Sequence, residues 1–398
     1  MTAIPSGRWM TSAIVAFLAL GSIFAFLQGV TYPLLAVRLE AMGYGADMLG
    51  LSGAMTPLGV LLTGPFFPRI TRCIGSGWSL LACLLLVVVV LLALPIWSNY
   101  ESWLALRFVL GVSISGFYVV GETGLQKVIS DDARGRLMGI YNAMMLLGYG
   151  AGPVLLSVIG TDGWLPFYCL FGVFALAGVM TALAFDDLPA VVSEDGANTE
   201  INAPLLFAFA APALLFAAGA VAVFDHVSTS LLPLYGVAKG LSEPVAMRVA
   251  TVALVGAMVG QLPVGWLADR WGVTPVMIGC CVAVTLGCAA LVPLIATPFV
   301  WPLAFVWGAA AFGPLTAAMT DLGRRFAGNM IIIGNVAIGM TFGFSQAIGS
   351  SVVGTAMEVV GPDGFSLVLG VLFALVAVSY VVRGVRTGAF RPARRETA

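Results

Sequence analysis

Twelve long apolar stretches, separated by short polar spacers, fill nearly all of the 398 residues. Crossing the hydrocarbon core of a bilayer takes roughly 20 apolar residues in a helix, which pairs all of its own backbone groups where water is absent. The sequence therefore predicts an all-α membrane protein with 12 transmembrane helices. The predicted spans are Met10–Val37, Leu49–Phe67, Trp78–Ile96, Trp103–Leu125, Leu137–Ile159, Leu165–Phe185, Pro204–Leu234, Ala246–Leu267, Thr274–Ile295, Phe299–Leu322, Met330–Met357 and Phe365–Val382.

The composition excludes a soluble fold. Apolar residues make up 60% of the chain and charged residues 9%, whereas a soluble domain has about 45–50% and about 25%. No basic patch with interleaved aromatic residues suggests nucleic-acid binding, and no glycine-rich phosphate loop suggests direct use of ATP. The first stretch is too long for the apolar region of a signal peptide, so it is predicted to remain as the first span.

Nothing in the sequence points to catalysis or to a cofactor. The six cysteines lack the spacing of metal ligands, so neither a metal site nor a disulfide is expected. With one histidine, no trio of nucleophile, base and orienting group can be assembled. The chain is therefore not expected to be an enzyme.

The distribution of lysine and arginine predicts the orientation. The N-terminal segment, alternate loops and the tail carry fourteen of these residues, while the opposite loops carry only Arg38, Lys239 and Arg248. Because positive charge accumulates on the cytoplasmic side, both termini are predicted to be cytoplasmic. The expected location is the inner (plasma) membrane, where the chain is expected to contact lipid and to work as a monomer.

An acidic segment divides the chain into two halves. Residues 186–203 hold five acids and no basic residue and are predicted to be a cytoplasmic linker between bundles at 1–185 and 204–398. The halves partly repeat: 26–35 aligns with 224–233, and 160–164 aligns with 361–365. We therefore expect two pseudo-symmetric six-helix bundles, with a solute site near the midplane and alternating access by rocking.

The loop at 265–272 reads Gly-Trp-Leu-Ala-Asp-Arg-Trp-Gly, and its first-half counterpart at 64–69 keeps the glycine and arginine but has proline in place of the acid. A carboxylate at a helix end can pair with an arginine and with a neighbouring helix N-terminus. This loop resembles the signature of the major facilitator superfamily, which implies that family's fold across nearly the whole chain. The predicted conformational latch consists of Asp269, Arg270, Arg69, Arg134 and Arg136, and Asp321 with Arg324 and Arg325 is expected to form a further cytoplasmic cluster.

Two segments resemble the family's proton-coupled drug antiporters. The fourth span contains Arg107-Phe-Val-Leu-Gly111, similar to the membrane arginine motif of that group. The fifth contains Gly148-Tyr-Gly-Ala-Gly152-Pro153, similar to the antiporter motif, in which glycines and a proline bend and pack the helix. The second glycine pair found in many members is replaced by 154–157. Arg107 near the start of its span could instead snorkel to the interface.

The candidate proton-coupling residues are Glu122, Asp225, His226 and Arg107. At 100° per residue, Arg107, Tyr118 and Glu122 share one broad helix face. A buried glutamate can exchange a proton for a solute, although Glu122 could also lie in water at the membrane surface. A histidine, whose unperturbed pKa is about 6.5, suits a proton carrier, although a lone histidine is more often structural.

Further polar groups in apolar spans are candidates for solute binding, or alternatively for hydrogen bonds between helices. The repeat aligns Gln28 with His226, which predicts equivalent places in a shared cavity. The candidates are Gln28, Tyr32, Tyr118, Asn142, Gln261, Asn335 and Gln346.

Together these features predict a secondary transporter that exports a small amphipathic or hydrophobic compound by proton antiport. One alternative is a proton symporter that imports a sugar, a carboxylate or a metal chelate. Another is a receptor or lipid-scrambling protein that uses the same scaffold without transport.

Overall fold

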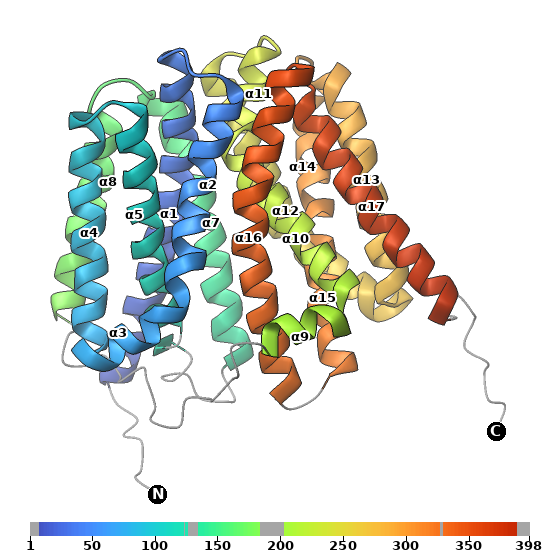
Figure 1. The fold of residues 1–398 in the computed structure, drawn as a ribbon, viewed down its shortest axis with the longest axis horizontal. Coiled ribbons are helices and arrows are strands. Elements are labelled where there is room, and N and C mark those ends of the chain that lie inside the picture. The colour runs from blue at the N-terminus through green and yellow to red at the C-terminus, as the bar shows by residue number, and fades with distance from the viewer. Residues whose placement is uncertain (1–7, 123, 126–133, 184–202, 327–328, 388–398) are drawn as a thin grey trace, which may run out of the picture.

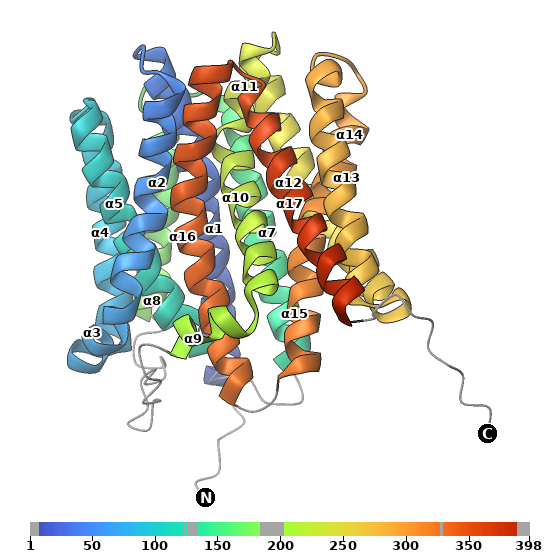
Figure 2. The ribbon, with the colours of Figure 1, turned by 45° about the vertical axis from the view of Figure 1, so that its right-hand side comes forward.

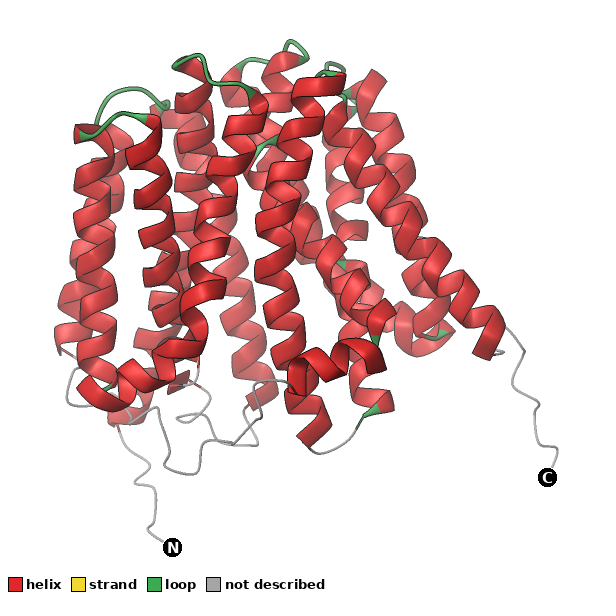
Figure 3. Ribbon diagram, viewed as in Figure 1, coloured by secondary structure: helices red, strands yellow, loops and turns green. Residues whose placement is uncertain are grey.

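The regular elements of the protein are all helices in the part of the chain that the computed structural model describes, residues 8–122, 124–125, 134–183, 203–326 and 329–387 (Figures 1 and 3). The first half contains α1 (Arg8–Ala41), α2 (Ala46–Thr63), η1 (Gly64–Phe66), α3 (Phe67–Ile74), α4 (Ser76–Ile96), α5 (Tyr100–Phe117), η2 (Tyr118–Glu122), α7 (Arg134–Ile159) and α8 (Leu165–Leu183). The second half contains α9 (Ala203–Ala210), α10 (Pro212–Ser230), α11 (Leu232–Ala238), α12 (Glu243–Trp271), α13 (Val273–Leu294), α14 (Val300–Ala311), α15 (Gly313–Arg325), α16 (Asn329–Val360) and α17 (Gly364–Thr387).

These helices occupy the twelve predicted stretches. Ten spans within the described residues are long and apolar enough to cross a membrane, and two shorter apolar helices, Ala143–Ile159 and Leu165–Thr181, fill the fifth and sixth places. Large apolar side chains such as Phe209, Leu262 and Val158 are exposed at the surface. Such a surface suits contact with lipid tails. The predicted all-α membrane fold is confirmed.

The helices run across the molecule between two ends. α1 begins and α17 ends at the end drawn at the bottom of Figure 1, which we call the lower end (Figures 1 and 2). The turns after α1, α4, α7, α11, α13 and α16 lie at the opposite, upper end. The predicted linker lies almost entirely outside the described residues.

The two halves repeat the same packing. In the first half α1 packs on α7, α2 on α5 and α4 on α8; in the second, α10 packs on α16, α12 on α14 and α13 on α17. The halves meet where α2 packs along α16 and where α7 packs along α12 (Figure 1). Each of these contacts has its counterpart in the other half, as expected of a duplicated chain.

The turns repeat as well as the helices. In each half, three glycines with positive φ, a conformation that disfavours other residues, stand at matching places between helices. The pairs are Gly43 (φ 88°) with Gly240 (95°), Gly75 (85°) with Gly272 (88°), and Gly160 (78°) with Gly361 (91°). A fourth in the first half, Gly163 (φ 65°), has no positive-φ counterpart among the described residues of the second half.

Two predicted spans are interrupted, which corrects the sequence-based boundaries. The stretch Pro204–Leu234 forms three helices, α9, α10 and α11, and the stretch Phe299–Leu322 is divided between α14 and α15. Within these two spans, each helix that follows an interruption has a proline in its first turn. These prolines are Pro212 in α10, Pro233 in α11 and Pro314 in α15. Proline suits a helix start but removes a backbone donor from a helix interior, so hydropathy alone overestimated the continuity of these spans.

Candidate functional site

Tyr32, in the middle of α1, is a meeting point for polar side chains from both halves. The Arg107 guanidinium carbon lies 5.8 Å from the centre of its ring. The His226 ring packs edge-on at 4.7 Å between centroids, and the Tyr149 ring does so at 6.3 Å. The Tyr32 hydroxyl donates a hydrogen bond to Gln28 Oε1 at 3.1 Å. One side chain thus connects α1, α5 and α7 of the first half with α10 of the second.

Arg107 is buried to 1% exposure. Its Nη1 donates to Ser52 Oγ on α2 at 3.3 Å, and its backbone carbonyl accepts from Thr56 Oγ1 at 3.1 Å. Its Nε and Nη2 have no hydrogen-bond partner within the described chain. The side chain lies ~10 Å below the start of α5, from the helical rise per residue. This burial differs from that of an arginine that snorkels into water at the interface.

His226 bridges the halves from α10 to α2. It is fully buried, and its Nε2 lies 3.1 Å from the backbone carbonyl of Gly53. A carbonyl only accepts hydrogen bonds, so Nε2 carries the ring hydrogen and Nδ1 of the neutral ring is an acceptor. No partner for Nδ1 is found in the described part of the protein.

The halves approach most closely where α2 crosses α16. A Cβ atom on Gly50 would overlap the backbone carbonyl of Ser350, and one on Gly53 would overlap the Ser350 hydroxyl. Glycine is needed for this approach, as is usual where membrane helices touch. The Ser350 hydroxyl is buried and has no partner among the described residues. We call the group formed by Tyr32, Ser52, Arg107, His226 and Ser350 the seam.

Asp225 precedes His226 and lies at the edge of the seam. It is partly exposed, and its Oδ2 accepts a hydrogen bond from Gln346 Nε2 on α16 at 3.2 Å. One turn later on α10, the Thr229 hydroxyl donates to the Asp225 backbone carbonyl at 2.7 Å and lies 3.0 Å from the Tyr149 hydroxyl on α7. The carboxylate therefore stands beside a direct contact between the halves.

Gln28 joins the seam to the start of η2, which follows α5. Its Nε2 lies 2.9 Å from the Tyr118 hydroxyl, and its Oε1 accepts from Tyr32. Gln28 and His226, the two residues aligned by the repeat, both contact Tyr32. At Tyr118 the helix becomes the π-helix η2, so a spacing of 100° per residue does not hold from Tyr118 to Glu122.

Three further predicted site residues are described by the structure and lie outside the seam. Gln261 is partly buried on α12 and makes no hydrogen bond with described residues, and Arg69 and Arg270 are exposed. Arg270 packs on the Trp266 ring, 5.3 Å from its centre. The predicted residues whose side chains lie outside the described part are Glu122, Arg134, Arg136, Asn142, Asp269, Arg324 and Asn335.

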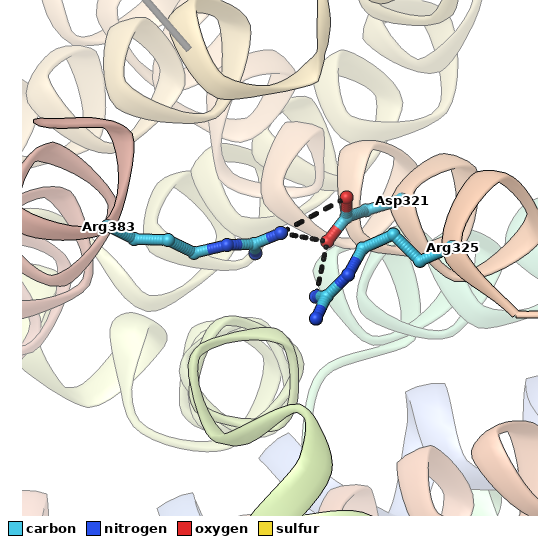
Figure 4. A network of polar contacts seen from close by, with 3 residues as sticks. All are labelled: Asp321, Arg325 and Arg383. Carbon is cyan, nitrogen blue, oxygen red and sulfur yellow. Dashed lines mark hydrogen bonds and ion pairs between the residues drawn. The ribbon is translucent and has the colours of Figure 1, made fainter. Parts of the chain in front are cut away.

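The ionic cluster described at the lower end is centred on Asp321 of α15 (Figure 4). Arg325, one turn along, donates to Asp321 Oδ2 at 3.2 Å, and Arg383 of α17 donates to the same oxygen at 3.0 Å. We call these three residues the lower brace. The sequence analysis grouped Asp321 with Arg325 but missed Arg383, which lies 62 positions further on.

Hydrogen bonds also join the halves at the upper end. Thr161 Oγ1 donates to Glu243 Oε1 at 2.7 Å, and the backbone N–H of Ala46 donates to Glu358 Oε2 at 2.9 Å. With the contacts of His226 and Thr229, four hydrogen bonds join the halves among the described residues, from the upper end to the middle. None of the upper-end partners was expected from the sequence.

The predicted antiporter motif presses α7 against α1. A Cβ atom on Gly148 would overlap the Ser22 carbonyl, and one on Gly152 would overlap the Gly29 backbone; Pro153 is buried. A hollow of about 360 Å³ beside this contact does not reach Asp225 or His226. Its lining residues are Ser22, Ile23, Phe26, Leu147, Gly148, Ala151 and Val173. That a shared cavity between the halves brings water to Asp225 stays a prediction.

Known proteins of similar sequence are membrane transporters. YfkF of Bacillus subtilis (strain 168), an uncharacterized MFS-type transporter, is 23% identical over 346 residues, 85% of this chain and 86% of the relative. YcaD of Escherichia coli (strain SE11), also an uncharacterized MFS-type transporter, is 26% identical over 337 residues, 84% of each chain.

Solved structures share the fold at low sequence identity. The nucleoside transporter NupG superposes with a TM-score of 0.76 at 13% identity and covers 94% of this chain and 99% of its own. A D-xylose-proton symporter superposes with a TM-score of 0.72 at 15% identity and covers 94% and 97%. The family model of the Major Facilitator Superfamily matches residues 13–337. The chain therefore belongs to the major facilitator superfamily and is a multi-pass membrane transporter.

Proposed function

We propose that the protein is a proton-coupled secondary transporter that exports a small amphipathic or hydrophobic compound by antiport. The observation that carries this proposal is Asp225, a partly exposed carboxylate in the C-terminal part of α10, beside the contact between the halves. An ionisable group inside a membrane span is costly, which favours a functional role for it. We further propose that the transporter works as a monomer in the inner membrane with both termini in the cytoplasm.

The surroundings of Asp225 depend on how the two halves are placed. Its carboxylate accepts a hydrogen bond from Gln346 of its own half, while Thr229, one turn away, contacts Tyr149 of the other half. Rocking that separates α10 from α7 breaks the Thr229 contact and changes the surroundings of Asp225. A group whose environment differs between two conformations can couple proton binding to the switch. His226 and Glu122 are proposed as further titrating groups.

Export by antiport is favoured by the resemblance of the Arg107 and Gly148–Pro153 segments to the drug antiporter group. In the structure the second segment holds α7 close to α1. This contact keeps the first half rigid while it moves as a body.

A second candidate is proton symport of an organic acid. The buried Arg107, whose Nε and Nη2 lack partners in the described chain, can balance the charge of a carboxylate. Uptake of such an acid together with a proton moves no net charge when the acid is monovalent.

The proposal is tested in proteoliposomes with an imposed pH gradient. The test compound is the one that most stabilises the purified protein in a thermal-shift screen at two pH values. Asp225→Asn should reduce gradient-driven flux by at least about tenfold, a change of ~1.4 kcal/mol, while exchange of the compound without a gradient continues. Asp363→Asn is the matched control, because Asp363 pairs with Lys239 outside the seam.

The sign of the proton flux separates the two candidates. Antiport moves protons against the direction of the compound, whereas symport moves them with it. Glu122→Gln should also abolish gradient-driven flux in a folded protein. Undiminished gradient-driven flux in Asp225→Asn would remove this residue from the mechanism.

A further inference from the structure

The guanidinium of Arg107 has no counter-charge in the described structure. The ion pairs among the described residues join Lys239 to Asp363, and Asp321 to Arg325 and Arg383. Asp225, the acid next to the seam, is engaged by Gln346. A guanidinium offers five N–H donors, and the one side-chain hydrogen bond found for Arg107 is with Ser52.

This charge cannot be lost by deprotonation, because arginine stays protonated in proteins. Burying an unpaired charge is costly, and it is more costly still inside a membrane. A membrane-spanning helix such as α5 is more stable with an apolar residue in place of Arg107. An arginine kept here without a partner therefore points to an anion that supplies the missing charge for part of the transport cycle.

Groups beside Ser52 and Gly53 of α2 supply the chemistry for such a site. Ser52, which accepts from Arg107, and Gly53, which accepts from His226, are consecutive residues of α2. The unpartnered Ser350 hydroxyl lies against Gly53. Because Nδ1 of neutral His226 is an acceptor, the donors available to an anion are the Arg107 nitrogens and the Ser350 hydroxyl.

We infer that the seam binds the anionic end of the transported compound, a carboxylate held by Arg107 and Ser350, with Tyr32 beneath the guanidinium. Arginine and carboxylate form two parallel hydrogen bonds, which makes the pairing strong and directional. Hydrogen bonds join the halves both at the upper end and beside Arg107 in this structure, so the compound reaches Arg107 when the halves separate. This inference rests on the proposed transport function and adds the chemical class of the compound.

The test compares matched acids and amides on the purified protein. The probes are benzoate, phenylacetate and 4-phenylbutyrate, each beside its primary amide, with sodium chloride at equal ionic strength. Binding to the native state raises the melting temperature. At least one acid should stabilise the wild-type protein, while its amide and chloride should not. Arg107→Met should abolish the stabilisation.

A second measurement needs no ligand. Without added acid, Arg107→Met should melt at or above the wild-type temperature, because it removes an unpaired charge. Arg38→Met is the matched control and should melt lower, since Arg38 of α1 donates to the backbone carbonyls of Thr161 and Gly163. If Arg107→Met cannot be purified, Arg107→Lys replaces it in the test. This variant should weaken the response to acids, because lysine lacks the planar guanidinium that forms two parallel hydrogen bonds with a carboxylate.

Several results would overturn the inference. These are a melting temperature of Arg107→Met that falls as far as that of Arg38→Met, amides or chloride that stabilise as well as the acids, or no response to any acid. Asp225→Asn separates this outcome from the transport proposal. Loss of gradient-driven flux in Asp225→Asn with equal responses to acid and amide keeps proton coupling and removes the anion site. If the stabilisation by acids depends on Arg107 while the flux of Asp225→Asn is unchanged, the anion site is kept and proton coupling by Asp225 is removed.

Discussion

Two arginines in membrane-spanning helices of this transporter have opposite surroundings. Arg383, in the lower brace, keeps 27% of its side chain exposed and is paired with Asp321. Arg107, in the seam, is 1% exposed and is paired with no acid in the described chain. If stability alone governed the placement of charge, the more deeply buried arginine would be the better paired. The brace therefore has the character of a structural contact, whereas Arg107 in the seam keeps two nitrogens without a hydrogen-bond partner in the described chain, as the proposed anion site requires.

The largest effect is expected from a substitution that prevents α2 and α16 from packing closely beside the seam. Gly50→Ala places a Cβ atom against the Ser350 backbone, and overpacking of this kind costs about 1–3 kcal/mol. We expect gradient-driven flux to fall by about tenfold or more, because the halves can no longer close over Arg107. The measurement is initial flux in proteoliposomes at equal protein content.

Gly343→Ala is the matched control for this substitution. It lies on the same pair of helices but nearer the lower end, where its Cβ atom would stand 3.5 Å from Leu61 Cβ, an ordinary contact. Flux should stay near the wild-type value. Equal losses in the two variants would show that the seam is no more sensitive than the rest of the interface.

Neutralising the lower brace should affect stability more than transport. Asp321, whose side chain is 12% exposed, meets two arginines, so Asp321→Asn should lower the free energy of unfolding by about 1–3 kcal/mol, between the values for surface and buried pairs. Arg383→Gln should cost less, and Arg325→Gln, which is 35% exposed, least of all. Thermal unfolding checks this order. A brace whose loss left the melting temperature unchanged would be no structural contact.

Loosening the upper end should shift the balance between conformations. Thr161→Val removes the hydrogen bond to Glu243 across the halves, worth about 1 kcal/mol, and should favour the opened upper end roughly fivefold. Distances between spin labels on α2 and α16 report this population. Thr181→Val is the control, since Thr181 donates to Ala177 within α8; a similar shift there would argue against a specific closing contact.

The smallest expected effect concerns Tyr32. Tyr32→Phe keeps the ring beneath Arg107 and beside His226 but loses the hydrogen bond to Gln28. Binding of the acid probes should weaken by about twofold to tenfold, the range for one neutral hydrogen bond. Titration of the thermal shift measures it. A complete loss of binding would mean that the hydroxyl, rather than the ring, holds the ligand.

Hydropathy predicted the fold well because lipid leaves the backbone few alternatives. It overlooked the breaks at Pro212, Pro233 and Pro314, since an apolar average does not register a missing backbone donor. The spacing of Gly148 and Gly152 correctly indicated tight packing, because the absence of a side chain is visible in the sequence.

The candidate site was only partly predictable. Arg107, Asp225, His226 and Tyr32 are conspicuous because each is polar in an apolar helix. Ser52 and Ser350 gave no such signal, since serine in a membrane helix usually bonds to its own backbone. Their role depends on how two separate bundles are placed against each other, which local spacing does not encode.

The matched glycines at the turns have a consequence for how such a chain can diverge. Gly43, Gly75 and Gly160 and their partners Gly240, Gly272 and Gly361 hold the same backbone corners in both halves, while the helices between them share few side chains. The corners preserve the architecture, which leaves the helical faces free to specialise. One ancestral unit could thus acquire the proposed anion site at Arg107 in one copy and the proposed proton carrier Asp225 in the other, while the turns stay the same.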